Sequence, residues 1–363
     1  MPDQTKPVRV ALVGYGFAGQ TFHAPLIRSV PGLQLAVVVS GNPDRVRKDL
    51  PEVTVQPSLE RALACNDVDI DLVVVATPNQ THVPFATAIL EAGKHVTVDK
   101  PFTATLAEAR SLAELASARG RILSVFQNRR WDSDFLAAKA ILADGRLGDV
   151  VHFESHIDRY RPDVPLRWRE QRGPGAGLWY DLGPHLVDQA LQLFGLPSAI
   201  LGHLARQRAG AEVDDWAHAI LDYGRLQVIL HASSLAANAA PRFLIHGTKG
   251  TWTKRRADVQ EDQVRSGMTP GTRGWGEDPD AATFFDGATG QSIALRAPAG
   301  DHRRYYIALR DAIFGQGPNP VTPIQAMAVM AILEAAALPP ADRRALPLTE
   351  AERAQWDASA SVA

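Results

Sequence analysis

The sequence contains a single cysteine, Cys65, among its 363 residues. One cysteine excludes an intrachain disulfide and most cysteine-rich metal sites. An excess of either charge is also missing, because 38 basic residues balance 40 acidic ones to a formal net charge of −2. The chain therefore lacks the basic surface that binds nucleic acids or anionic membranes, and we expect neither as a partner.

Long apolar runs are absent as well. No stretch approaches the roughly 20 apolar residues that a membrane helix needs. Residues 1–7 are polar and show no apolar segment behind a basic start, which a signal peptide would have. We therefore expect a cytoplasmic protein. Hydrophobic residues make up 45% of the chain, and its length suits two globular domains.

The first half of the chain alternates apolar strand-like runs with helical patterns. We expect strands at 8–13, 33–39, 53–55, 71–76, 95–98 and 121–125, with helices between them at 19–29, 58–64, 82–92 and 106–119. Continuous apolar strands separated by helices are typical of a doubly wound parallel sheet that is covered on both faces. The sequence therefore predicts an α/β fold that begins with a Rossmann domain, assigned here to residues 1–126.

The pattern changes after about residue 145, where strands follow one another with short connections. We expect strands at 150–160, 199–207, 215–223, 225–233, 242–247 and 251–255, and helices at 181–194, 302–314 and 324–337. Such spacing favours a largely antiparallel open sheet. Residues 127–363 are therefore predicted to form a C-terminal α+β domain, with its late helices free to pack on the Rossmann domain. Residues 264–286 are expected to form a long loop that serves as a lid or a subunit contact.

A glycine motif, Gly14–Tyr15–Gly16–Phe17–Ala18–Gly19, directly follows the first predicted strand. Glycines at this spacing allow a tight turn, close approach of a pyrophosphate and close packing of helix on strand. The helix that follows directs free N–H groups and the positive end of its dipole at the phosphates. In this context the motif predicts a dinucleotide cofactor, and a purely structural turn is the alternative.

Cofactor choice is usually determined at the end of the second strand, where NAD enzymes carry an acidic residue that binds the ribose hydroxyl. This chain has no acid there until Asp44, whereas Ser40, Asn42 and Arg45 can donate to a 2′-phosphate. Arg47 is a less suitable donor. The sequence therefore favours NADP and leaves NAD as the second choice.

Two further segments carry residues suited to proton transfer. Lys100 precedes a proline at the carboxyl end of a predicted strand, where ligands bind in such sheets. Asp181 and His185 are four residues apart, which places them on one face of a helix. Asp181 alone could cap that helix, and His185 alone could be a core histidine. Together, a lysine, a carboxylate and a histidine can move a proton from an alcohol.

With these motifs in this order, nearly the whole chain resembles the glucose–fructose oxidoreductase / inositol dehydrogenase (Gfo/Idh/MocA) family. The resemblance rests on the glycine motif, residues 76–82, residues 99–101, the pair at 181 and 185, and residues 302–306 and 329–337. Residues 125–135 and 159–162 are similar to the NADP-dependent scyllo-inositol dehydrogenase branch of that family. Two positions differ from the family pattern, since Asp99 replaces the usual Glu and His302 stands where relatives often have Tyr.

The resemblance implies roles for individual residues. Lys100 would lie beside the nicotinamide and bind the reacting hydroxyl, His185 would act as general base or acid, and Asp181 would orient both. The remaining cofactor contacts implied by the family are Thr77, Pro78, Asn79, His82, Asp99, Gln127, Trp168 and Arg169. The implied substrate contacts beyond the catalytic residues are Asn128, Arg129 and Tyr160.

The expected reaction is hydride transfer between NADP(H) and a secondary alcohol of a cyclic polyol or sugar, with scyllo-inositol the favoured substrate. Reduction of another sugar or keto-substrate, and a non-catalytic NADP(H)-binding sensor, are the alternatives. The reaction needs no metal, and the histidines show no HExxH or paired ligand spacing. Because an antiparallel sheet usually exposes one face, we also expect a homodimer or homotetramer formed through the C-terminal sheet.

Overall fold

The computed structural model describes residues 6–65, 69–339 and 344–360, and the first residues of the predicted polar start lie outside this range. Its first sheet has six parallel strands in the order β3-β2-β1-β4-β5-β6. These are β1 (Val8–Val13), β2 (Leu33–Val39), β3 (Thr54–Gln56), β4 (Leu72–Val75), β5 (His95–Val98) and β6 (Leu123–Val125). This is the strand order of the Rossmann fold, and the prediction of a doubly wound sheet is confirmed.

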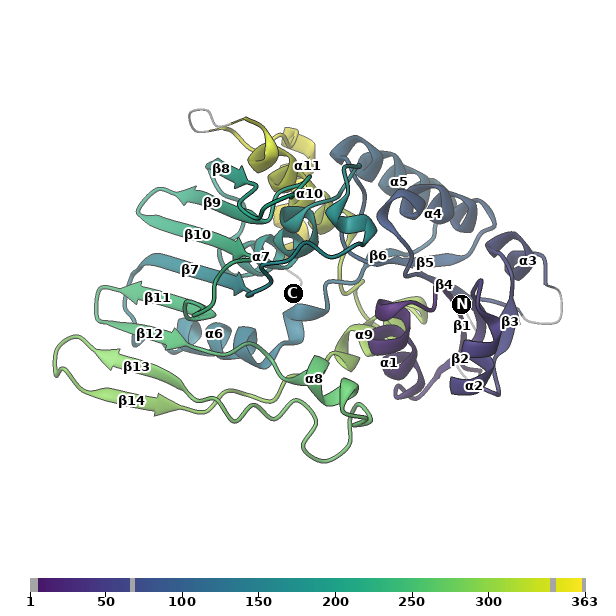
Figure 1. Cartoon of the computed structure of the whole chain (residues 1–363), viewed down its shortest axis with the longest axis horizontal. Coiled ribbons are helices and arrows are strands. Elements are labelled where there is room, and N and C mark those ends of the chain that lie inside the picture. The colour runs from purple at the N-terminus through teal and green to yellow at the C-terminus, as the bar shows by residue number, and fades with distance from the viewer. Residues whose placement is uncertain (1–5, 66–68, 340–343, 361–363) are drawn as a thin grey trace.

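Helices cover both faces of this sheet because its central strands are apolar on both sides. Figure 1 shows α4 (His82–Glu91) and α5 (Leu106–Arg119) on one side, and α1 (Ala24–Arg28) on the other. The smaller helices are α2 (Pro43–Asp49) and α3 (Leu59–Leu63). The strand order reverses between the neighbours β1 and β4, and in such sheets ligands bind in the crevice beyond the carboxyl ends of these strands.

The second sheet has eight strands in the order β14-β13-β12-β11-β7-β10-β9-β8. They are β7 (Val150–Asp158), β8 (Ala199–Ala205), β9 (Trp216–Tyr223), β10 (Leu226–Ser233), β11 (Phe243–Gly247), β12 (Gly250–Lys254), β13 (Ala282–Asp286) and β14 (Ser292–Leu295). All neighbours are antiparallel except β7 and β10, which run parallel in the middle of the sheet. The predicted, largely antiparallel sheet is confirmed.

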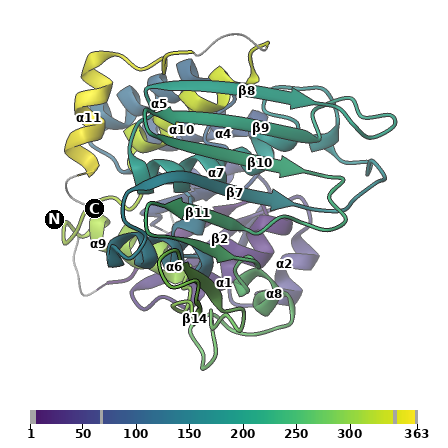
Figure 2. The same ribbon diagram turned by 90° about the vertical axis from the view of Figure 1, so that its left-hand side faces the viewer.

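One face of the second sheet packs on helices. α7 (Leu178–Phe194) contacts β10, and α10 (Pro323–Ala337) contacts β8. Figure 2 shows the strands in front of the helices, so that the opposite face is left without a helix from the described part of the chain. Within the same residues, no helix combines the length and the apolar character needed to cross a membrane.

The late part of the chain returns to the Rossmann domain. α9 (Arg303–Ile313) packs against α1, and α10 packs against α5, where the Leu106 N–H donates to Glu334 Oε1 at 2.7 Å. A final helix, α11 (Glu350–Ala360), also contacts α10. The division of the chain at residues 126 and 127 remains a prediction.

The segment 264–286 differs from the predicted loop. Its start belongs to α8 (Gln260–Arg265) and its end forms β13, which pairs with the unpredicted β14 at the edge of the sheet. The residues between these elements are held in place, because Trp275 is buried and its Nε1–H donates to Asp301 at 3.2 Å. Helices at α2, α6 (Ser133–Asp144) and α11 were also not predicted.

Candidate active site

A cavity of about 580 Å³ lies at the carboxyl edge of the Rossmann sheet and is closed on its other side by the second domain. The predicted site residues that line it are Gly16, Phe17, Ala18, Thr77, Pro78, Asp99, Lys100, Asn128, Arg129, Trp168, Arg169, Asp181 and His185. The predicted residues outside its lining are Gly14, Tyr15, Gly19, Ser40, Asn42, Arg45, Asn79, His82, Gln127 and Tyr160. The structure thus brings the three predicted catalytic residues together in one cavity.

The glycine turn fits a dinucleotide. A Cβ on Gly14, whose φ is +100°, would lie 2.4 Å from the Ala76 carbonyl oxygen, and one on Gly19 would lie 2.2 Å from the Gly14 oxygen. These two glycines permit the tight packing of the turn. A Cβ on Gly16 would have no atom within 4 Å, so this side of the turn is open to a phosphate. The helix that follows begins as a π-turn, η1 (Gly19–His23), a form that often occurs at functional sites.

Lys100 and Asp181 form an ion pair between the two domains. The Lys100 ammonium donates to the Asp181 carboxylate at 3.0 Å and to the Asp181 backbone carbonyl at 2.7 Å. Arg169 lies nearby, with its Nε 3.7 Å from the same carboxylate oxygen. Burial alone would raise the pKa of Asp181, but the charges of Lys100 and Arg169 hold that pKa well below its usual range. Asp181 is therefore ionised at neutral pH.

His185 lies one helical turn after Asp181 and is buried at the end of the cavity. Burial is the main reason that its pKa falls well below 6.5, and the charges of Lys100 and Arg129 lower it further. Within the described structure, its Nδ1 is buried and has no hydrogen-bond partner. His185 is thus a neutral imidazole beside a lysine, which is the state that a general base requires.

Helix α7 begins earlier than predicted, and this changes what Asp181 does. The helix starts at Leu178, and its first N–H groups are bound by Asp214, which accepts from Leu178 N at 2.9 Å and from Trp179 N at 2.7 Å. Asp181 therefore lies inside the first turn and makes no capping hydrogen bond. Because Asp214 supplies the cap, the Asp181 carboxylate is left to pair with Lys100.

Several predicted cofactor residues hold the loops of the site together. The His82 ring lies between two carbonyl oxygens, with Nε2 3.0 Å from Thr77 O and Nδ1 2.9 Å from Pro101 O, and its one N–H can donate to either. Asn79 donates to Gly175 O at 2.8 Å. Asp99 accepts from the backbone N–H of the next residue at 2.8 Å. Gln127 is buried, and its Oε1 has no partner among the described residues.

The residues that follow β2 surround the edge of the glycine turn. Asn42 caps α2 by accepting from Arg45 N at 3.2 Å, and Ser40 Oγ accepts from Asn42 N at 3.1 Å. The Arg45 guanidinium donates to the side chain of Gln20 in η1, which places it beside the turn. Arg47 instead pairs with Asp44, as expected for a poorer candidate.

Tyr160 is the predicted substrate residue that the structure turns away from the cavity. Tyr160 is 60% exposed, whereas its neighbours Arg159 and Arg161 line the cavity. Successive side chains of an extended segment point to opposite sides, so a contact by Arg159 and Arg161 excludes Tyr160 from the same wall. Tyr160 thus lies outside the cavity lining, and its contact with the substrate remains a prediction.

The cavity lining also contains three further charged residues that were not predicted, Arg167, Glu261 and Arg265. Glu261 lies 3.7 Å from the guanidinium of Arg129, which also donates to Asp132 at 2.9 Å. Because Glu261 and Arg265 belong to the short helix α8, which the sequence pattern did not reveal, no local signal placed them at the cavity.

Comparison with known proteins gives a consistent assignment over both domains. Residues 8–127 match the family described as "Oxidoreductase family, NAD-binding Rossmann fold", and residues 139–348 match "Oxidoreductase family, C-terminal alpha/beta domain". The chain is 50% identical over 329 residues to the uncharacterized oxidoreductase YdgJ of Escherichia coli, which covers 90% of this chain and 94% of that protein.

A relative with a named activity is scyllo-inositol 2-dehydrogenase (NADP(+)) IolW of Bacillus subtilis, which is 38% identical over 333 residues, covering 91% of this chain and 92% of that protein. Among solved structures, that of an oxidoreductase from Klebsiella pneumoniae superposes with a TM-score of 0.90 at 51% identity, covering 97% of this chain and 99% of that one.

Proposed function

Because this chain belongs to the Gfo/Idh/MocA family of oxidoreductases, we propose that it transfers a hydride between NADP(H) and a secondary alcohol of a cyclic polyol or sugar. The observation that carries the proposal is the convergence of Lys100, Asp181 and His185 on one cavity beside the glycine turn. The similarity to a scyllo-inositol dehydrogenase favours scyllo-inositol and its ketone as the substrate pair.

In this proposal, the nicotinamide group of the bound cofactor supplies the redox chemistry. Lys100 has three N–H donors, of which two are bound by Asp181, so that the third is available to the reacting hydroxyl. His185 accepts the hydroxyl proton during alcohol oxidation and returns it during reduction. Since Nδ1 is the buried ring nitrogen, we assign the transfer to Nε2. Asp181 fixes the position of the lysine and stabilises its charge.

NADP fits the residues that follow β2 better than NAD. No carboxylate occupies the position that would bind the ribose 2′-hydroxyl. Ser40 follows Val39, whose carbonyl accepts from Gly14 N, and Arg45 contacts Gln20, so both carry donor groups near the turn that could bind a 2′-phosphate. Asp44 is turned toward Arg47. We therefore propose NADP as the preferred cofactor.

Replacement of Arg45 by alanine tests this preference. The variant removes one charged hydrogen-bond donor, so we expect KM for NADP⁺ to rise about tenfold and KM for NAD⁺ to stay unchanged. Initial rates with each cofactor at saturating substrate measure both constants. Arg47→Ala is the matched control, because Arg47 pairs with Asp44 and should affect neither constant. An equal change for both cofactors in Arg45→Ala would contradict the proposed contact.

The substrate is tested by following the appearance of reduced cofactor with a panel of inositols, aldoses and polyols, with NADP⁺ and NAD⁺ in parallel. We expect turnover of scyllo-inositol with NADP⁺ preferred. Turnover of a different sugar would support the proposed mechanism but would show that scyllo-inositol is not the substrate. If no alcohol reacts while the cofactor binds tightly, keto-substrates are tested with NADPH. If no keto-substrate reacts either, the proposal is refuted, and the non-catalytic NADP(H)-binding sensor is the alternative that remains.

We also propose that the chain forms a homodimer or homotetramer through the open face of its second sheet. That face carries Trp216, Ile220, Ile229 and Leu244 side by side, all of them only partly buried in the single chain. Apolar side chains on an unpaired sheet face are stabilised when a second subunit covers them. Light scattering should give a mass of two or four chains, and a monomeric mass at micromolar concentration would disprove this interface.

A further inference from the structure

The open face of the second sheet is rich in histidine. Register places His231 of β10 opposite both His156 of β7 and His218 of β9, and His203 of β8 opposite His218. His246 of β11 lies opposite His152 of β7. Directly paired residues of neighbouring strands point to the same face. Six of the 11 histidines of the chain are therefore gathered on this one surface.

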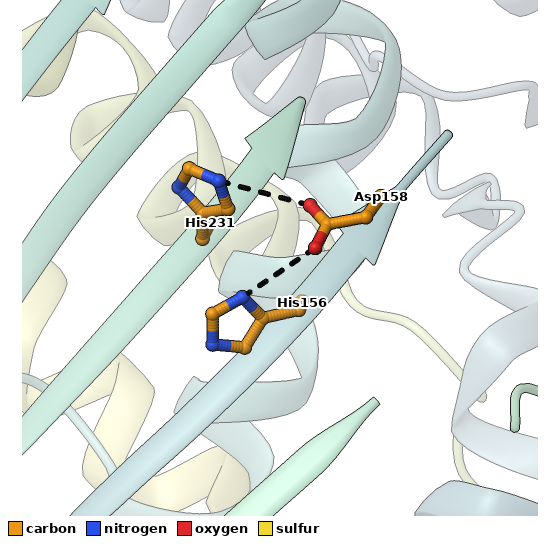
Figure 3. Close-up of side chains that lie close together, drawn as sticks. All are labelled: His156, Asp158 and His231. Carbon is orange, nitrogen blue, oxygen red and sulfur yellow. Dashed lines mark ion pairs between the residues drawn. The ribbon is translucent and has the colours of Figure 1, made fainter. Parts of the chain in front are cut away.

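Three residues of this face converge at the carboxyl end of β7. Figure 3 shows Asp158 between His156, from the same strand, and His231 from β10. Asp158 Oδ2 lies 3.9 Å from His156 Nδ1, and Asp158 Oδ1 lies 3.7 Å from His231 Nε2. One ligand atom from each of the three residues lies within 4.8 Å of the other two. These separations are too long for hydrogen bonds, so the three groups face one another without bonding.

Two of the facing atoms are buried and unpaired. Within the described structure, His156 Nδ1 and Asp158 Oδ1 have no hydrogen-bond partner, although the Asp158 side chain is only 5% exposed. Most buried polar atoms of proteins are paired, and an exception calls for a water or an ion. The opposite nitrogen of His156 is bound, because Nε2 donates to Glu154 Oε2 at 2.8 Å.

The contact with Glu154 settles which nitrogen of His156 carries the proton. The Glu154 carboxylate lies 2.8 Å from His156 Nε2 and 2.7 Å from His152 Nε2, and a carboxylate accepts where a ring N–H donates. With Nε2 donating to Glu154, a singly protonated His156 ring has its lone pair on Nδ1. That lone pair points toward the Asp158 carboxylate, and two electron-rich groups in this arrangement are stabilised by a cation between them.

We propose that His156 Nδ1, Asp158 and His231 Nε2 form a binding site for a divalent transition-metal ion of the zinc type. Zinc takes nitrogen and oxygen ligands at about 2.0–2.2 Å in a tetrahedron, which sets neighbouring ligand atoms about 3.4 Å apart. The separations from Asp158 Oδ2 to His156 Nδ1, 3.9 Å, and from Asp158 Oδ1 to His231 Nε2, 3.7 Å, are a few tenths of an ångström wider. All three ligand atoms lie within 4.8 Å of one another, so an inward movement of the side chains would complete the site. Water fills the fourth position.

The surroundings of the cluster match those of known metal sites. Metal-bound histidines usually donate their other ring nitrogen to a carboxylate, as His156 does to Glu154. The other ring nitrogen of His231 lies 3.3 Å from His218 Nδ1, which fixes the orientation of that ring. A second group, Asp132 with Asp258 and His302, is different, because His302 binds Asp132 at 2.6 Å and Arg129 neutralises the same carboxylate. The carboxylate of that second group is thus already paired with a guanidinium.

The site is separate from the catalytic chemistry proposed above. His156 and Asp158 lie beside a second cavity of about 310 Å³, which shares Arg129, Arg159 and Arg161 with the active cavity. None of the three ligands lines the active cavity itself. The alternation His152, Glu154, His156, Asp158 along β7 is the sequence signal for the cluster, because period-two spacing puts all four on one face. Metal binding can therefore be measured without reference to turnover.

The test is titration of the full-length, chelator-treated protein with Co²⁺, followed by the visible absorption of the bound ion, and then displacement by Zn²⁺. We expect one Co²⁺ per chain, with an absorption spectrum of tetrahedral type. His231→Gln and Asp158→Asn each remove a ligand and should lose that absorption. Glu154→Gln keeps all three ligands and should weaken binding by about 10–100-fold.

His203→Gln is the matched control, because His203 lies on the same face, three strands from His156, and contributes no ligand. It should bind Co²⁺ as the wild type does. Circular dichroism and thermal melts establish that each variant is folded, and if Asp158→Asn does not fold, His231→Gln and Glu154→Gln still decide the question. Saturable binding that survives in His231→Gln, or its absence from the wild type, would overturn the proposal.

Discussion

Replacement of Lys100 by alanine is expected to lower kcat by about 10²–10⁴-fold, the usual contribution of a positioned proton-transfer group. The variant removes the donor to the reacting hydroxyl and leaves the Asp181 carboxylate without its nearest cation. Binding of NADP(H) should remain nearly unchanged, because the phosphates are expected at the glycine turn and not at Lys100. Steady-state rates and fluorescence titration with NADPH measure the two effects separately.

Two further variants test whether the loss of activity is specific to the Lys100 ammonium group. Lys100→Arg keeps a positive charge beside Asp181 but changes the geometry of the donor, so we expect it to fold well and to remain strongly impaired. Lys94→Ala removes a lysine that pairs with Asp69 far from the cavity, and should behave as the wild type does. Wild-type turnover in Lys100→Ala would remove Lys100 from the mechanism.

Replacement of His185 by asparagine should lower kcat over a similar range, and the pH profile distinguishes its role from a structural one. Because burial holds the pKa of His185 well below 6.5, the base is neutral from neutral pH down to values below 6.5. We therefore expect kcat/KM for alcohol oxidation to fall on the acid side only below that value, when His185 gains a proton. Asp181 stays ionised throughout this range.

In His185→Asn this fall of kcat/KM at low pH should disappear, because the variant has no imidazole at this position to take up a proton. His95→Asn is a suitable control, since burial lowers the pKa of His95 to about 4 but the residue lies outside the cavity. If kcat/KM for alcohol oxidation still falls at the same low pH in His185→Asn, the proton transfer belongs to another group.

The Rossmann half could be predicted closely because its signals are local. The runs 8–13, 33–39 and 95–98 coincide with β1, β2 and β5, since buried parallel strands are apolar on both faces and their ends are marked by turns. The glycine motif and Lys100 could then be placed at the carboxyl edge of the sheet. These positions follow from strand direction alone.

The site could be predicted less well wherever it depends on distant parts of the chain. The start of α7 is set by Asp214, which lies more than 30 residues beyond the helix start, and no local pattern reveals that cap. The side of the chain that Tyr160 takes depends on the register of β7 with β10 and on the pairing of Tyr160 with Leu235. The edge strand β14 and its neighbour β13 have only four and five residues, and β14 is largely exposed, so neither gives a strong apolar strand pattern.

The ion pair of Lys100 and Asp181 connects the two halves of the chain at the active cavity, and each half supplies different residues of the site. The half that holds the glycine turn also carries the lysine, whereas the carboxylate and the histidine arrive on α7 from the other half. In the proposed reaction, the reacting hydroxyl therefore meets its base only where α7 of the second half faces the lysine of the first. A change in how the two halves pack is thus expected to shift the base relative to the lysine, even when the change lies far from the cavity.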